Sequence, residues 1–343
     1  MAFLGPVMID VDGFELSDDD RILLKNPLVG GVILFTRNFD TPQQVQQLIE
    51  EVKSLRDPQL LIAIDHEGGR VQRFKEPFTI IPALNTLGVK YDKDPDIALE
   101  HAELFGWLTS IELLSFNIDF SFTPVLDVDY GLSDVIGNRA FHQNPNVIAK
   151  LAAAYIDGMH RAGMSSTGKH FPGHGGVTED SHTDVPIDNR TLDVLFKSDI
   201  IPFEKLVPNH LDGIMPAHII YEKINDAPAG FSPFWLKEIL RTQLKFDGVV
   251  FSDDLDMKGA SCISDSYAER AKAALEAGCD MVLVCNNRSG AAEVLDELTY
   301  TVTNESHLHL LKMRRKNVTT HNWDDLIQTN EWKQAVTIIS EYQ

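Results

Sequence analysis

Residues 248–286 read GVVFSDDLDMKGASCISDSYAERAKAALEAGCDMVLVCN and contain the unit that decides the fold. Gly248–Asp253 is a short apolar run rich in β-branched residues, which is typical of a buried strand. Ser264–Ala277 has a helical pattern and is followed by Gly278, at the place where glycine commonly ends a helix. Asp280–Asn286 is a second apolar run. The stretch therefore predicts a strand, a helix and another strand.

The same alternation extends along the rest of the chain. Helical patterns separate the apolar runs, the clearest being the one from Pro42 after a capping Thr41, Pro95–Phe116, Val147–Arg161 and Ser232–Leu244. The apolar runs that we interpret as strands are Gly5–Asp10, Gly31–Phe35, Leu60–Asp65, Phe120–Val128, Met164–His170, Gly213–His218, Gly248–Asp253 and Asp280–Asn286. Eight strand–helix units predict an α/β fold in which a parallel sheet closes into a (β/α)8 TIM-type barrel.

A doubly wound open sheet is the alternative architecture. It would normally carry a glycine-rich phosphate-binding sequence after the first strand, whereas Gly5–Asp10 runs directly into Val11-Asp12-Gly13-Phe14. No linker rich in proline or serine divides the 343 residues. We therefore expect a single domain over residues 1–343, with the barrel over about 1–290 and a helical tail over about 291–343.

The charge of the chain excludes some classes of partner. Lys and Arg number 30 against 51 Asp and Glu, which gives a formal net charge of −21. Nucleic acids and anionic membranes are bound by basic surfaces, so we expect neither as a partner. An acidic small ligand stays possible, because one pocket can hold several basic side chains.

The N-terminus and the cysteines of the chain indicate a reducing compartment. The N-terminus has no basic start before its apolar stretch and reaches Asp10 at once, so it is a poor secretion signal. No apolar run approaches the length of about 18 residues that a membrane span needs. The three cysteines, Cys262, Cys279 and Cys285, lack C-x-x-C spacing, and we expect them to be small buried hydrophobes. These observations predict a cytoplasmic protein.

Several predicted strands end in polar residues. In a parallel barrel these ends meet at one rim, which is where barrel enzymes place their catalytic residues. The strand-end residues are Asp10, Asp65, Asp127, Lys169, His170, His218, Asp253 and Asn286.

The segment Lys169–His182, KHFPGHGGVTEDSH, is the densest of the polar clusters. It could be a polar loop with incidental histidines. It could also bind a metal through His170, His174 and His182 with Asp180, although Pro172 and Gly173 interrupt any helix that would align the first two. We favour proton transfer, in which Asp180 orients His182 and raises its basicity.

Two further clusters supply carboxylates and arginines. Asp253 ends an apolar strand, where a carboxylate could act as the nucleophile of a retaining glycosidase, although an N-cap or an acidic metal-binding pair is also compatible. Asp65 begins DHEGGRVQRF, whose carboxylate and arginines could bind sugar hydroxyls or form only a structural salt bridge. Arg139 lies just beyond the strand that ends near Asp127.

Together these motifs resemble glycoside hydrolase family 3. They are DHEGGRVQRF from Asp65, GNRAF from Gly137, KHFPGHG followed by DSH between Lys169 and His182, and FSDDLDM from Phe251. They occur in the order of the family. The resemblance is strongest to its single-domain bacterial cytoplasmic β-N-acetylglucosaminidases of peptidoglycan recycling, because the chain is too short for the second domain of larger members.

The resemblance implies a retaining exo-β-N-acetylglucosaminidase that needs no metal or cofactor. It is expected to act as a monomer on small carbohydrates such as muropeptides. Asp253 would be the nucleophile, His182 the acid/base and Asp180 its orienting partner. His66, where the family more often has Gln, could alter the edge of the pocket. The residues implied to bind the terminal N-acetylglucosamine are Asp65, Arg73, Arg139, Lys169 and His170.

Other functions stay open at this point. A phosphorylase would use the same covalent intermediate with phosphate as the acceptor, and a histidine acid/base tolerates such an anion. A metal-dependent barrel hydrolase would use the histidine cluster. A sugar-binding protein without turnover is the remaining alternative.

Overall fold

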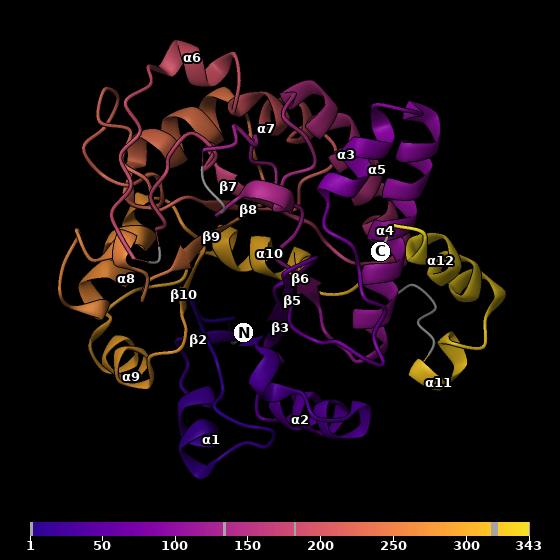
Figure 1. Ribbon diagram of the computed structural model, residues 1–343. Coiled ribbons are helices and arrows are strands. Elements are labelled where there is room, and N and C mark those ends of the chain that lie inside the picture. Colours follow the sequence, from indigo (N-terminus) through magenta and orange to yellow (C-terminus); the bar gives the residue numbers. More distant parts are fainter. Residues whose placement is uncertain (1–2, 133–134, 182, 317–321, 343) are drawn as a thin grey trace.

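The computed structural model describes residues 3–132, 135–181, 183–316 and 322–342. Its main sheet has eight strands in the order β6-β3-β2-β1-β10-β9-β8-β7, and every pairing between neighbours is parallel. Isolated parallel bridges between Phe120 and Ser165 and between Val125 and Lys169 join the two ends of this sheet. The sheet is therefore a nearly closed barrel with helices around it, as the alternation predicted (Figure 1).

The strands of the barrel overlap all of the predicted runs. They are β1 (Val7–Ile9), β2 (Val29–Leu34), β3 (Leu61–Ile64), β6 (Phe120–Ser121), β7 (Thr167–Phe171), β8 (Gly213–Pro216), β9 (Val249–Asp254) and β10 (Met281–Val284). The prediction for Phe120–Val128 was too long, because Pro124 has no N–H with which to continue the ladder. The sequence pattern also missed an antiparallel hairpin formed by β4 (His66–Gly68) and β5 (Val71–Gln72).

The helices begin and end close to the predicted signals. Thr41 accepts a hydrogen bond from the N–H of Gln44 through Oγ1, and Gly163 ends a helix with a φ of 95°. The α-helices are α1 (Asp18–Leu24), α2 (Pro42–Ser54), α3 (Asn85–Tyr91), α4 (Pro95–Ser115), α5 (Pro145–Ala162), α6 (Leu192–Phe196), α7 (Ile200–Leu206), α8 (Tyr267–Ala277), α9 (Arg288–Glu297), α10 (Asn304–Lys312), α11 (Trp323–Leu326) and α12 (Asn330–Ser340). The short 3-10 helices are η1 (Thr36–Asn38), η2 (Gly137–Arg139), η3 (Ala229–Phe231) and η5 (Lys258–Ala260). The segment predicted to be a helix up to Leu244 is a π-helix, η4 (Phe234–Gln243).

Aromatic side chains fill the interior of the barrel. Phe120, Phe122 and Phe251 are fully buried, and their ring centroids lie 5.2–5.3 Å apart. Phe122 also lines the pocket described below. Close packing of these rings gives the pocket a rigid floor.

The C-terminal helices pack on the outside of the barrel. Helices α11 and α12 lie beside α4 (Figure 1). Trp332 donates a hydrogen bond of 2.8 Å from Nε1 to Glu112, and the ring of Trp323 lies 5.3 Å from that of Phe116. No helix among the described ranges is both long and apolar enough to cross a membrane.

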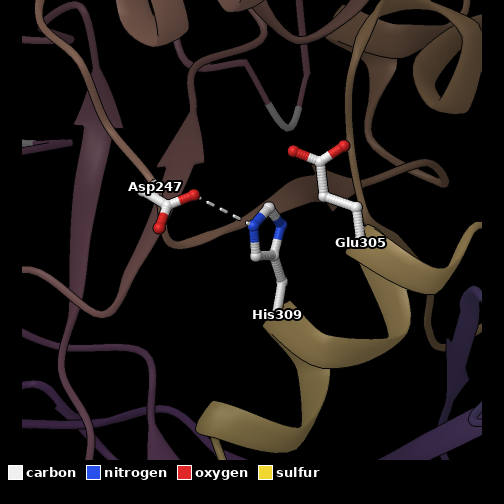
Figure 2. A group of neighbouring side chains, drawn as sticks. All are labelled: Asp247, Glu305 and His309. Carbon is white, nitrogen blue, oxygen red and sulfur yellow. Dashed lines mark ion pairs between the residues drawn. The ribbon is translucent and has the colours of Figure 1, made fainter.

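Helix α10 brings His309 to the amino ends of β9 and β10. Its Nε2 lies 3.5 Å from Asp247, with Glu305 one turn away on the same helix (Figure 2). Its Nδ1 lies 3.2 Å from Asp280. The Nζ of Lys312 lies 3.5 Å from the other oxygen of Asp247. We interpret this group as an ion-pair cluster that ties α10 to the barrel, with Lys312 already supplying a positive charge.

The expectation for the cysteines was only partly right. Cys279 and Cys285 are buried, whereas Cys262 is exposed in the turn after η5. Burial raises the pKa of Cys279 and of Cys285, so both stay protonated near neutral pH.

Candidate active site

A pocket of about 350 Å³ opens at the carboxyl ends of the barrel strands. This is the face where barrel enzymes carry their active sites. Its wall contains the predicted residues Asp65, Arg73, Arg139, Lys169, His170 and Asp253. The other lining residues include Phe35, Glu67, Arg70, Phe122, His174, Ser181, Asp254, Cys285 and Asn286. The pocket thus brings together residues that lie far apart in the sequence.

Two predicted catalytic residues, Asp180 and His182, follow β7 in the sequence. Asp180 is half-buried and precedes Ser181, whose side chain is buried and lines the pocket. His182 lies outside the described residues. The loop that carries the predicted Asp–His pair therefore reaches the pocket at Ser181.

A buried network of opposite charges forms one side of the pocket. The Nζ of Lys169 lies 2.9 Å from Asp65 and 2.7 Å from Glu67. Arg139 binds Glu67 in a bidentate manner, with both N–O distances at 2.8 Å. Arg73 lies 3.3 Å from the other oxygen of Asp65. Two carboxylates and three cations are thus held in fixed positions around one space.

The network keeps its carboxylates ionised. Burial alone would raise the pKa of Asp65, but Lys169 and Arg73 outweigh it and hold the pKa below its usual value. Burial of Glu67 is likewise outweighed by Arg139 and Lys169, so its pKa lies well below the usual range. Burial would lower the pKa of Lys169, but Asp65 and Glu67 raise it. These residues can therefore act as charged hydrogen-bond partners for sugar hydroxyls at neutral pH.

His170 is fixed by a carboxylate beneath the pocket. Nδ1 of His170 lies 2.7 Å from one oxygen of Asp127, whose other oxygen accepts from the backbone N–H of His174 at 2.7 Å. Burial of Asp127 is outweighed by His170, so the pKa of Asp127 is lowered. Because Nδ1 is occupied, Nε2 is the nitrogen that His170 can offer to a ligand.

Asp253 also lines the pocket, with Asp254 next to it in the chain. Its Oδ1 accepts a hydrogen bond of 2.8 Å from the N–H of Asp254. The carboxyl of Asp254 accepts from the N–H of Asp256 at 3.1 Å and of Cys285 at 3.0 Å. Burial raises the pKa of Asp254 to about 8. Asp254 is therefore a neutral acid near neutral pH, and it adds little negative charge next to Asp253.

The strand-end residues divide into two groups. Asp65, Lys169, His170, Asp253 and Asn286 line the pocket. Asp10, Asp127 and His218 are buried, and the pocket wall does not include them.

Each residue of the second group binds a member of the pocket wall from behind. Asp10 accepts from the N–H of Asn286 at 3.0 Å, and Nε2 of His218 binds the carbonyl oxygen of Asp254 at 3.1 Å. Asp127 binds His170 as described above. Five of the eight strand-end residues therefore line the pocket, and the other three bind its wall from behind.

Sequence reasoning missed Glu67 as a functional residue. The side chain is buried on β4 and binds two of the predicted sugar-binding cations. A charged residue two positions after Asp65 in a glycine-rich stretch was the available signal. The expectation for His66 was wrong, because its side chain is buried against Phe78 at a ring distance of 6.0 Å and does not line the pocket.

The comparisons with known proteins identify the family of the chain. Residues 7–314 match the glycosyl hydrolase family 3 N terminal domain. A beta-hexosaminidase from Thioalkalivibrio sulfidiphilus is 52% identical over 338 residues, which cover 98% of this chain and 96% of the relative. The crystal structure of NagZ from Neisseria gonorrhoeae in complex with N-trifluoroacetyl-D-glucosamine is similar with a TM-score of 0.93 and 43% identity, over 99% of this chain and 98% of that one.

A second solved structure extends the similarity. A family 3 β-N-acetylglucosaminidase from Paenibacillus gives a TM-score of 0.88 at 31% identity, over 98% of this chain and 67% of that one. Sequence, fold and pocket therefore agree, and the chain belongs to glycosyl hydrolase family 3, as a glycoside hydrolase of the beta-hexosaminidase type.

Proposed function

We propose that the enzyme is a retaining exo-β-N-acetylglucosaminidase of peptidoglycan recycling. Its substrates would be fragments such as GlcNAc-1,6-anhydroMurNAc, with or without peptide, from which it releases the terminal N-acetylglucosamine. The observation that carries this proposal is that the charged network of Asp65, Lys169, Glu67 and Arg139 lines the same pocket as Asp253.

The size and chemistry of the pocket support recognition of a single terminal sugar. At about 350 Å³ the pocket is at the small end of ligand sites. Asp65 would accept from sugar hydroxyls, while Arg73, Lys169 and His170 would donate to them. NagZ from Neisseria gonorrhoeae binds N-trifluoroacetyl-D-glucosamine, which supports an N-acylated glucosamine as the ligand.

The proposed reaction uses two steps at the anomeric carbon. Asp253 would attack this carbon while His182 protonates the leaving oxygen, so that the glycosidic bond breaks and an ester to Asp253 forms. His182 would then take a proton from water, which attacks the anomeric carbon and releases Asp253. Two inversions give net retention. Asp180 would orient His182 and stabilise its protonated form.

A histidine suits the second step for an electrostatic reason. Deprotonated histidine is neutral, so it adds no negative charge near Asp253 when it activates water. The same property would tolerate phosphate as the acceptor, which is the basis of the phosphorylase alternative. The proportion of free sugar to sugar 1-phosphate in the presence of phosphate separates the two reactions.

Turnover of an aryl β-N-acetylglucosaminide, compared with the aryl β-glucoside, tests the proposal. We expect turnover of the acetamido sugar only, with free N-acetylglucosamine as the product with or without phosphate. Asp253→Ala and Asp253→Asn are expected to abolish nearly all turnover while N-acetylglucosamine still binds. Sugar 1-phosphate as the main product would contradict the hydrolase assignment, and wild-type activity in either variant would place the nucleophile elsewhere.

We also propose that the chain acts as a cytoplasmic monomer and that the tail over about 291–343 folds as part of the barrel domain. Packing of α11 and α12 on α4 supports the second statement. Sedimentation analysis tests whether the chain is a monomer. Limited proteolysis tests the single domain, because a stable fragment without the tail would contradict it.

A further inference from the structure

His218 is a strand-end residue for which the proposed reaction has no use. It follows β8 by two positions and its side chain is 0% exposed. The pocket wall does not include it, so it cannot touch the sugar in this arrangement. Its contacts nevertheless lead directly to Asp253.

One residue, Asp254, links His218 to the predicted nucleophile through its backbone C=O and N–H, which lie on either side of its Cα. Nε2 of His218 binds the backbone carbonyl oxygen of Asp254 at 3.1 Å. The backbone N–H of Asp254 donates to Oδ1 of Asp253 at 2.8 Å. His218 therefore holds the residue whose N–H orients the Asp253 carboxylate.

The protonation of His218 follows from its partners. A carbonyl oxygen can only accept, so Nε2 must carry the hydrogen. Nδ1 is buried and has no hydrogen-bond partner among the described residues. A charged imidazolium would leave a buried N–H unsatisfied there, which is costly. Burial accordingly lowers the pKa of His218, although the charge of Asp253 acts in the opposite direction.

Two neighbours fix the plane and the depth of this imidazole. The ring of Phe231 stacks on it at a centroid distance of 5.3 Å and an interplanar angle of 17°. Gly259, in the turn that follows Asp253, packs so closely that a Cβ there would lie 2.8 Å from Cβ of His218. The backbone N–H of Gly259 donates to the carbonyl oxygen of Ser181 at 2.9 Å. Two contacts thus hold the segment after the nucleophile. His218 binds it at Asp254, and Ser181, in the loop that carries Asp180, binds it at Gly259.

We propose that His218 is a positioning residue of the glycosidase reaction. As a neutral Nε2–H donor to the carbonyl oxygen of Asp254 it holds the backbone of this residue, and through the N–H of Asp254 the Asp253 carboxylate, in the orientation for attack on the anomeric carbon. This proposal rests on the role proposed above for Asp253. A neutral donor suits the position, because a cation there would stabilise the carboxylate and weaken it as a nucleophile.

The test compares variants that keep or remove the donor. His218→Gln can still donate to Asp254, whereas His218→Leu and His218→Phe cannot, and the phenylalanine ring can still stack on Phe231. The measured quantity is the rate at which a 5-fluoro-β-N-acetylglucosaminyl fluoride captures the nucleophile covalently, followed by mass spectrometry of the intact protein. His309→Leu removes a buried histidine at the other end of the barrel and serves as the matched control.

Loss of the donor is expected to slow covalent capture by about 10- to 100-fold, because small misplacements of a reacting group have effects of this size. Binding of N-acetylglucosamine should stay near the wild-type level, and His218→Gln should recover most of the rate. His309→Leu should lower the Tm but leave the capture rate unchanged. Wild-type rates in His218→Leu or His218→Phe, or an equal loss in all three His218 variants, would overturn the proposal.

A measurement on the wild-type protein keeps the proposal testable even if the variants do not fold. In protein labelled with 15N-histidine, the His218 resonances should report the neutral Nε2–H tautomer throughout the pH range of activity. An Nδ1–H tautomer or a charged ring in that range would overturn it. If peptide mapping finds the captured sugar on a residue other than Asp253, the proposed function itself fails, which distinguishes the two outcomes.

Discussion

The carboxylate of Asp127 binds Nδ1 of His170 at 2.7 Å and the backbone N–H of His174 at 2.7 Å. Asp127 is fully buried, and the oxygen that accepts from His174 also accepts from the backbone N–H of His170 at 3.2 Å, so it contributes to the site through these contacts. Its effect is to turn Nε2 of His170 toward the pocket and to fix the start of the loop that carries Asp180.

Asp127→Asn is expected to lower kcat/KM for an aryl β-N-acetylglucosaminide by about 10- to 100-fold. The amide cannot accept at both positions, and a hydrogen bond to a charged group contributes about 1.5–3 kcal/mol. Steady-state kinetics measure the loss, and we expect much of it in KM because His170 is predicted to bind the sugar. Asp129→Asn is the control, since Asp129 accepts a hydrogen bond from the N–H of Gly131 in an exposed turn. Equal effects of the two substitutions would contradict this role of Asp127.

Glu67→Gln is expected to weaken both sugar binding and folding. The substitution leaves Arg139 and Lys169 buried without their shared carboxylate, and loss of one partner from a buried ion pair costs about 3–5 kcal/mol. Urea unfolding of wild type and variant at two pH values measures the difference in the free energy of unfolding.

The pH dependence of this difference has a definite sign. Burial opposes ionisation of Glu67, but Arg139 and Lys169 hold its pKa well below the ordinary value of 4.5. A lowered pKa of an acid stabilises the folded state above the pKa of the unfolded chain and loses this effect as the pH falls through the folded pKa. The difference between wild type and Glu67→Gln should therefore be largest near neutral pH and shrink in acid. If the difference in the free energy of unfolding between wild type and Glu67→Gln grows in acid, Glu67 does not stabilise the fold as an ionised partner of Arg139 and Lys169.

Asp254→Asn is expected to change how kcat depends on pH above about pH 8. Burial raises the pKa of Asp254 to about 8, so in the wild type its ionisation above that pH adds a negative charge beside Asp253. We expect kcat of the wild type to fall in this range and the fall to be smaller in Asp254→Asn. Near pH 7 the two should differ by less than about 10-fold, because the neutral acid and the amide carry no charge. If kcat falls equally in the wild type and in Asp254→Asn at alkaline pH, ionisation of Asp254 is not the cause of the fall.

Asp254 also links pH to stability. A raised pKa of an acid favours the folded state when the group is protonated, so this contribution decreases as the pH rises from the ordinary value of 3.8 to about 8. Thermal unfolding should therefore show a smaller loss of Tm in Asp254→Asn than in the wild type across this range.

His182→Ala is expected to affect substrates with poor leaving groups more than activated aryl glycosides. An activated leaving group needs little protonation, whereas an alkoxide leaving group depends on the general acid. The measurement is the dependence of kcat/KM on the pKa of the leaving group. Thr183→Ala alters the neighbouring exposed side chain and serves as the control. An equal loss on all substrates would assign His182 to binding or to another step.

Local patterns in the sequence predicted most of the fold. The alternation of apolar runs and helices predicted the eight parallel strands, because burial on both faces requires apolar residues along each strand. The hairpin of β4 and β5 was not predictable in this way, because strands as short as His66–Gly68 and Val71–Gln72 show no clear periodicity. The π-helix over Phe234–Gln243 has the same apolar spacing as an ordinary helix.

Site residues that belong to sequence motifs could be predicted. Residues whose role depends on a partner far away in the sequence could not. Motifs provided Asp65, Lys169 and Asp253, and all three line one pocket. Glu67 was missed because its partner Arg139 is 72 positions away, and nothing in the local pattern indicates that the two meet.

The sequence by itself determined the order of strands and helices and which chemical groups stand at the strand ends. Only the tertiary structure decided which of those groups line the pocket. Asp253 and His170 line the pocket, while Asp127 and His218 lie beneath it and hold its wall. The reason is that the depth and direction of a side chain at a strand end depend on the neighbouring strands and loops, which come from distant parts of the chain, and not on the run of residues that precedes it.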